Sequence, residues 1–304
     1  GIKSGDEVIV PDINWIASAA PITYLGATPV CVDVLEDTWC IDPQKVLQAV
    51  TSKTKAVIAV HLYGNLCEMD ELQQICEDHS LFLIEDAAEA IGSRYNGKMA
   101  GSIGDLACFS FHGTKTFTTG EGGALVVNND RFSDDIDTLA NHGRRADASK
   151  MFWCDKIGFK YKMSNLQAAI GCAQIERADF LINRKREIFH SYSRYLPEAK
   201  FAMNPEKTNT FNSYWMPTVI MPQVDEQIRD QIMDRLNQLG IDARPFFYPL
   251  TQQGDKKLFK HFAENRISYS INAKGMNLPS YVDMSDEQVK LVCDELLKAV
   301  DYYI

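Results

Sequence analysis

Short runs of apolar and β-branched residues alternate with stretches of helical pattern along the first half of the chain. The apolar runs are Val8 to Val10, Pro29 to Val34, Ala56 to Val60, Leu81 to Ile84, Ala107 to Phe111 and Ala124 to Val127. Between them, Asp42-Pro43 is a typical helix start, and residues 68–79 have a helical pattern. This alternation is typical of βαβ units, so the sequence predicts an α/β fold with a mostly parallel sheet flanked by helices.

The pattern changes after residue 164. Ser164 and Gln167 form a capping box that opens a helical run reaching toward Tyr195. A strand over 214–221, a helix over 225–239, a strand over 244–248 and a last helix capped by Ser285 follow. We therefore expect a large α/β domain over residues 1–184 and a smaller α+β domain over 185–304. Because the first strand begins almost at once, we also expect the large domain to lack N-terminal elements.

Composition narrows the range of partners. The 304 residues include 31 Lys and Arg against 41 Asp and Glu, a formal net charge of -10 that would repel a nucleic-acid backbone. A phosphorylated small molecule remains possible, because a few local cations can hold a phosphate. We expect no membrane span, because no apolar run approaches about 20 residues. The eight cysteines show no metal-ligand spacing, which favours a reducing cytoplasm and no metal site.

Two residues at strand ends suggest chemistry. Asp86 follows the run that ends at Ile84, and Lys115 lies in a glycine-rich turn beyond the next strand. Ligands of such sheets bind at the carboxyl ends of the strands. Asp86 as a helix cap and Lys115 as a solvated charge are the simpler readings. Together the two residues suggest pyridoxal 5'-phosphate, whose aldehyde forms a Schiff base with a lysine while an aspartate pairs with its ring nitrogen.

Motifs in one order over nearly the whole chain support this cofactor. They are residues 5–11, 26–29, 60–64, 84–90, 104–105 and 109–112, Lys115 with 120–123, and 161–165 with 167–171. With these motifs the chain resembles the nucleotide-sugar aminotransferases, pyridoxal phosphate enzymes of fold type I in the aspartate aminotransferase superfamily. Residues 244–249 and 277–280 are most similar to members that aminate C4 of GDP-4-keto-6-deoxymannose.

The resemblance implies a role for each matching residue. Lys115 would hold the cofactor and shuttle the proton, and Asp86 would pair with the ring nitrogen. Trp15 and Ala88 would cover the two ring faces, although Trp15 also suits plain core packing. Ser110 would bind the phosphate, unless its hydroxyl bonds only to neighbouring backbone. Glu89 is expected near the ring oxygen.

The resemblance also implies a homodimer whose two active sites are shared. Many relatives have Asn-Tyr-Arg where this chain has Lys160-Tyr161-Lys162. Lys160 would meet the cofactor phosphate and Lys162 the substrate, and the alternative is that both are solvated surface lysines. Arg244 and Tyr248 would face the sugar nucleotide, unless they belong to a packed strand edge. Relatives carry a phosphate-binding Gly-Thr loop upstream, and this sequence begins after it.

The implied reaction is a transamination in two halves. L-glutamate would give its amino group to the enzyme, and a nucleotide-linked ketosugar would then take it. A dehydratase on the same fold is an alternative, but relatives with that activity replace the lysine with His, and Lys115 argues against it. A non-catalytic or truncated cofactor-binding protein is the other alternative.

Overall fold

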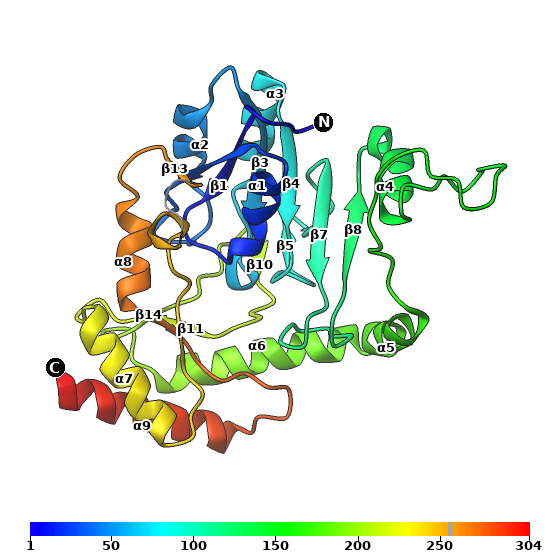
Figure 1. Ribbon diagram of the computed structural model, residues 1–304. Coiled ribbons are helices and arrows are strands. Elements are labelled where there is room, and N and C mark those ends of the chain that lie inside the picture. Colours follow the sequence, from blue (N-terminus) through cyan, green and yellow to red (C-terminus); the bar gives the residue numbers. More distant parts are fainter. Residues whose placement is uncertain (255–257) are drawn as a thin grey trace.

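The computed structural model describes residues 1–254 and 258–304 and has a seven-stranded sheet at its centre (Figure 1). The strand order is β13-β2-β1-β3-β4-β7-β8, and only β8 runs antiparallel to its neighbour. The strands are β1 (Glu7–Pro11), β2 (Thr28–Val32), β3 (Thr54–Val60), β4 (Phe82–Asp86), β7 (Leu106–Ser110), β8 (Gly123–Val127) and β13 (Lys260–His261). The prediction of an α/β fold with a mostly parallel sheet is confirmed.

The other strands form two smaller sheets. One has the order β12-β14-β11-β9 and is antiparallel throughout. Its strands are β9 (Ala202–Met203), β11 (Thr218–Ile220), β12 (Arg244–Pro245) and β14 (Gly275–Asn277). The other consists of β5 (Arg94–Tyr95), β6 (Lys98–Met99) and β10 (Thr210–Phe211).

The helices pack around these sheets. They are α1 (Ala20–Tyr24), α2 (Pro43–Ala49), α3 (Met69–His79), α4 (Ser133–Ala140), α5 (Asn165–Ile175), α6 (Ala178–Tyr195), α7 (Glu226–Gln238), α8 (Arg266–Lys274) and α9 (Asp286–Tyr303). Short 3-10 turns are η1 (Ile16–Ser18), η2 (Leu62–Gly64), η3 (Asp130–Phe132) and η4 (Leu250–Gln252). In Figure 1, α6 runs beneath the carboxyl ends of β4 and β7, and the segment between α4 and α5 extends away from the sheet.

Three predicted elements differ from the structure. The helical run from Ser164 to Tyr195 is two helices, because Arg177 leaves the helical conformation (φ -109°, ψ 15°) between α5 and α6. The strand expected over 214–221 is limited to β11, since Tyr214 has a φ of 49° that an extended strand does not allow. The strand expected over 244–248 covers only β12.

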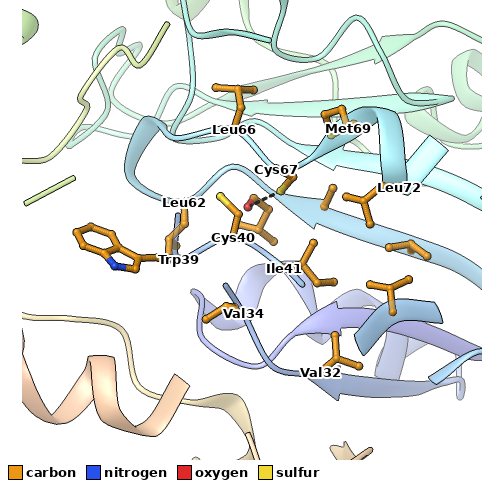
Figure 2. Packing of buried hydrophobic residues seen from close by; sticks show 14 of the residues in the cluster. Val32, Val34, Trp39, Cys40, Ile41, Leu62, Leu66, Cys67, Met69 and Leu72 are labelled. Atoms are coloured by element: carbon orange, nitrogen blue, oxygen red, sulfur yellow. Dashed lines mark hydrogen bonds between the residues drawn. The ribbon is translucent and has the colours of Figure 1, made fainter. Parts of the chain in front are cut away.

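The described residues contain three clusters of buried apolar side chains, and two of them bear on the position of the site. The first joins β1, β2 and β3 to α2 and α3, and Figure 2 shows its packing around Ile41, Leu62 and Leu72. In this cluster the Cys67 thiol donates a hydrogen bond to the Val60 carbonyl at 3.2 Å. The second cluster joins α6, α7 and α9 to the sheet of β11 and β14. The first cluster therefore fixes the end of β3, and the second holds α6 in place.

The division at residue 184 stays a prediction. Helix α6 spans this position, β13 pairs with β2, and β10 pairs with β5, so segments after residue 185 join sheets of the first part. Across 1–254 and 258–304, none of the helices is both long and apolar enough to cross a membrane. Within the same ranges, the acidic, His and Cys side chains form no group of three or more placed to hold a metal ion.

Candidate active site

The predicted site residues of the large sheet meet at its carboxyl edge. Asp86 is the last residue of β4, and Ser110 is the last residue of β7. The register of these parallel strands pairs Asp86 with Cys108, two residues before Ser110. Trp15 lies in the segment that follows β1 and directly precedes η1. The edge therefore brings an aspartate, a hydroxyl and an aromatic ring into one region.

Asp86 is held by two hydrogen bonds to its carboxylate. The Ser18 hydroxyl donates to Oδ2 at 2.6 Å, and the Ala88 N–H donates to Oδ1 at 3.1 Å. Residues 87–93 form turns and not a helix, so the reading of Asp86 as a helix cap is wrong; the Ala88 contact closes a turn after β4. Ser18 ties η1 to the end of β4 and so brings the chain next to Trp15 toward Asp86.

A buried pair behind Asp86 fixes the end of β4. Glu85 and His61 are both fully buried, and His61 Nε2 lies 2.9 Å from Glu85 Oε2. Backbone N–H groups of residues 101, 103 and 104 also donate to the Glu85 carboxylate. Burial acts to raise the pKa of Glu85, but these hydrogen bonds and His61 hold it below its ordinary value. The strand end that carries Asp86 is thus rigidly anchored.

Lys115 lies on the turn after β7, where its amine has two close neighbours. Nζ lies 3.3 Å from Glu89 Oε1 and 3.8 Å from the centre of the Trp215 ring. The Trp215 indole N–H donates to the Thr114 carbonyl at 2.8 Å, so this ring is bonded to the residue that precedes Lys115. Trp215 is only 5% exposed. The ring therefore shields one side of the amine from water.

Tyr63 contacts both neighbours of the Lys115 amine, Trp215 and Glu89; we call these three residues the enclosure of the amine. Its ring stacks on Trp215 with 6.0 Å between centres, and its backbone N–H donates to Glu89 Oε2 at 2.8 Å. Burial raises the pKa of Glu89, and the nearby Asp86 charge acts in the same direction. The Lys115 charge and the Tyr63 N–H oppose this rise. Glu89 is thus within electrostatic reach of both Asp86 and Lys115.

Four other predicted residues, Ser110, Trp15, Tyr248 and Arg244, differ in their surroundings. Ser110 Oγ accepts a hydrogen bond from the His112 N–H at 3.2 Å, a bond to neighbouring backbone of the kind expected as the alternative. Trp15 is 61% exposed, which argues against plain core packing, and its ring centre lies 6.2 Å from that of Phe247. Tyr248 follows Phe247 and is also exposed. Arg244 pairs with Asp242 at 2.7 Å and lines the same cavity as Lys115.

Lys160 and Lys162 do not lie at the carboxyl edge of the large sheet. Both are exposed on the segment between α4 and α5, which extends away from the sheet (Figure 1). Lys160 forms an isolated bridge with Asn141 at the end of α4. Their side chains therefore do not join the enclosure around the Lys115 of their own chain.

Sequence reasoning missed Trp215 and the role of Tyr63. Trp215 lay in a predicted strand, where an aromatic residue suggests core packing. Tyr63 follows β3 at the carboxyl edge, and this position was a signal that pointed to the site. Its backbone has a left-handed φ of 52°, a strained conformation that sequence does not reveal for a tyrosine.

The groups at this edge fit pyridoxal phosphate. The cofactor needs an amine for its carbonyl carbon, a carboxylate for its ring nitrogen, donors for its phosphate and a flat surface for its ring. Lys115, Asp86, Ser110 and Trp15 offer these groups in that order. The buried Asn14 Oδ1, next to Trp15, has no hydrogen-bond partner among the described residues, as expected beside a site that takes a polar ligand.

The chain is similar to known aminotransferases in sequence and in fold. The chain is 41% identical to GDP-perosamine synthase of Vibrio cholerae and 39% identical to that of Escherichia coli O157:H7, in each case over 97% of this chain and 80% or 79% of the relative. Its fold matches the putative sugar aminotransferase Spr1654 from Streptococcus pneumoniae in its PMP form, with a TM-score of 0.94 and 27% identity, covering 100% of this chain and 84% of that one. The family model described as DegT/DnrJ/EryC1/StrS aminotransferase matches residues 1–297. The chain therefore belongs to the DegT/DnrJ/EryC1/StrS aminotransferase family.

Proposed function

We propose that this chain is a pyridoxal phosphate-dependent enzyme that moves the amino group of L-glutamate to C4 of GDP-4-keto-6-deoxymannose and so makes GDP-perosamine. The observation that carries the proposal is the Lys115 amine, enclosed by Glu89 and Trp215 at the edge where Asp86 ends β4. The choice of sugar rests on the two GDP-perosamine synthases, which are about 40% identical to this chain.

Besides Lys115 and Lys160, whose roles follow below, five residues would hold the cofactor. Asp86 would place a negative charge at the ring nitrogen, and Trp15 and Ala88 would cover the two ring faces. Ser110 would bind the phosphate, and Glu89 would lie beside the ring oxygen. Pyridoxal phosphate supplies an electron sink that makes the loss of a proton next to an amine feasible.

Lys115 is the catalytic residue. Its Nζ would bind the cofactor in the resting enzyme and, once free, accept the proton that glutamate loses from Cα. Trp215 covers one side of the amine, and Glu89 Oε1 lies 3.3 Å from it, so the two residues together fix the position of the amine. A group that must both take and return a proton needs such a fixed position.

The active unit would be a homodimer with shared sites. None of the 11 residues of α5 is buried, and its exposed side chains include the apolar Leu166, Ile170 and Ile175. A helix that exposes so much apolar surface is typical of a protein interface. In the dimer, Lys160 would reach the cofactor phosphate and Lys162 the substrate of the partner's site.

The substrate would bind where the two predicted domains, 1–184 and 185–304, face each other. Arg244 and Tyr248 would contact the nucleotide sugar from the second domain. We place the enzyme in the cytoplasm because all eight cysteines are free thiols. The product, an activated amino sugar, would serve the synthesis of a polysaccharide such as the lipopolysaccharide O-antigen.

The test is a direct assay of the complete reaction. The purified protein is loaded with pyridoxal phosphate and incubated with L-glutamate and GDP-4-keto-6-deoxymannose, and the product is identified by mass spectrometry. We expect GDP-perosamine from the wild type and none from Lys115→Ala. The dTDP- and UDP-linked ketosugars should react at least tenfold more slowly. Equal turnover of a dTDP- or UDP-linked sugar would refute the choice of substrate.

A further inference from the structure

A cavity of about 550 Å³ opens beside Lys115. Its walls come from the turn over 113–118, from α6 and from the segment that follows β14. Cavities that bind ligands the size of a nucleotide have volumes of about 300 to 1,000 Å³. The space is thus large enough for a substrate much bigger than an amino acid.

Most of the charged residues that line the cavity are positive. Lys115, Arg177, Lys185 and Arg244 line it, and Asp242 is the acidic residue of its wall. Asp242 is already paired with Arg244 at 2.7 Å. The whole chain carries a net charge of -10, so this local excess of cations is unusual for its surface. Such a cavity attracts an anion.

Lys185 is the most informative of these cations. It is 9% exposed, and its Nζ donates to the carbonyl and the hydroxyl of Ser280. Over the described ranges, its Nζ has no carboxylate within 4 Å. Burial lowers the pKa of Lys185 to about 8. A buried cation without a counter-charge is costly, and a bound anion would offset that cost.

We propose that Arg177 and Lys185, with Arg244, bind the diphosphate of the nucleotide-linked sugar. This inference rests on the proposed function, which supplies that substrate. A diphosphate carries at least two negative charges and matches several cations at once. The volume of the cavity also favours a nucleotide sugar over glutamate. Lys185 therefore helps to choose the amino acceptor without taking part in proton transfer.

The test measures binding of GDP to the cofactor-loaded enzyme by calorimetry. Arg177→Gln and Lys185→Gln should each weaken GDP binding by about 10- to 100-fold, as expected for the loss of one charged hydrogen bond. Gln at position 185 keeps a donor for Ser280, and Arg177 is an exposed residue whose replacement should not disturb folding. Lys200→Gln is the matched control, because Lys200 is an exposed cation that pairs with Asp301.

A second readout separates the two substrates. The rate at which L-glutamate changes the absorbance of the cofactor should be the same in both variants and in the wild type. GDP binding that is unchanged in Arg177→Gln and Lys185→Gln would overturn the inference. A slower glutamate step with unchanged GDP binding would also overturn it, since the cations would then hold the donor's carboxylate. Failure of the wild type to aminate the sugar, with GDP binding as expected, would refute only the proposed function.

Discussion

In the proposed reaction one primary amine would carry the chemistry, and its neighbours would decide how it behaves. The Lys115 amine lies between the Glu89 carboxylate and the face of Trp215, and Tyr63 links these two residues from behind. Contact with an aromatic face stabilises an ammonium group by up to about 2 kcal/mol where water is excluded. Trp215 is therefore expected to orient the amine, although it does not itself exchange a proton.

Replacing Trp215 tests this role. In Trp215→Phe the aromatic face stays but the bond to the Thr114 carbonyl is lost, whereas Trp215→Leu loses both. We expect kcat to fall about threefold in Trp215→Phe and about tenfold or more in Trp215→Leu, since about 1.4 kcal/mol corresponds to tenfold in rate. The rate at which L-glutamate changes the absorbance of the cofactor should fall by a similar factor in Trp215→Leu, because the amine that moves the proton loses its neighbour.

Trp39→Phe is the control for this experiment. Trp39 is equally buried but packs edge-on against Phe246 in the core. Its replacement should lower the melting temperature and leave kcat as in the wild type. An unchanged kcat in Trp215→Leu, with a lower melting temperature only, would show that Trp215 is merely a core residue.

The sequence predicts the place of a site residue where that place depends only on its position at the end of a strand. Asp86 and Ser110 end neighbouring strands, so their meeting at one edge follows from the βαβ pattern alone. The contact of Lys115 with Trp215 joins residues 100 positions apart and depends on how the last part of the chain packs. No local pattern contains that information.

At the scale of elements, α6 connects the large sheet to the end of the chain. Arg184 donates to the carbonyls of Val282 and Met284, and Lys185 donates to Ser280. Two consecutive residues of one helix thus hold the loop between β14 and α9. The same loop forms a wall of the cavity beside Lys115.

The buried Lys185 predicts a pH effect on stability. Its pKa is about 8 in the folded protein and near its ordinary value of 10.5 in the unfolded chain. Between these pH values the unfolded chain binds more protons, so stability rises with pH, by about 3 kcal/mol in all. Below pH 8 the full cost of burying the charge remains. Chemical denaturation of wild type and Lys185→Met across pH 7.5 to 10.5 measures the difference between the two.

We expect the wild type to gain stability relative to Lys185→Met as the pH rises, because other titrating groups cancel in the comparison. A difference that stays constant with pH would mean that the Lys185 pKa is not depressed. Lys200→Met, at an exposed site on the same protein, should show no such trend.

Element boundaries were less predictable than element types. The capping box at Ser164 correctly marked the start of α5, but no residue pattern indicated the break at Arg177. The two helices differ in environment, since α6 packs into the second core and α5 has no buried residue. The turn at Tyr214 was hidden for a similar reason, because a left-handed tyrosine is imposed by the surrounding packing.

At the scale of the whole molecule, the exposed α5 and the distant Lys160 and Lys162 point to shared sites. Mixing two inactive variants tests this arrangement. Lys115→Ala would lack the proposed catalytic amine, and a Lys160→Ala, Lys162→Ala double variant would lack the two lysines proposed to enter the partner's site. Half of the dimers in a randomised equal mixture are mixed and have one intact site of two, so about a quarter of wild-type activity should return.

A mixture that stays inactive, although mass measurement shows mixed dimers, would contradict shared sites. The double variant keeps its own Lys115 enclosure, so it should still fold and keep a wild-type melting temperature. Lys160 and Lys162 are exposed, and replacing exposed residues usually changes the free energy of unfolding by less than about 0.5 kcal/mol.

The central claim is that Lys115 holds pyridoxal phosphate and passes protons in a transamination. The most direct measurement is the visible absorption spectrum of the purified protein with pyridoxal phosphate, before and after L-glutamate, beside Lys115→Ala. We expect a band of lysine-bound cofactor in the wild type that glutamate converts to the amine form, and neither change in the variant. A wild type that forms no such band, or a variant that responds to glutamate equally fast, would contradict it.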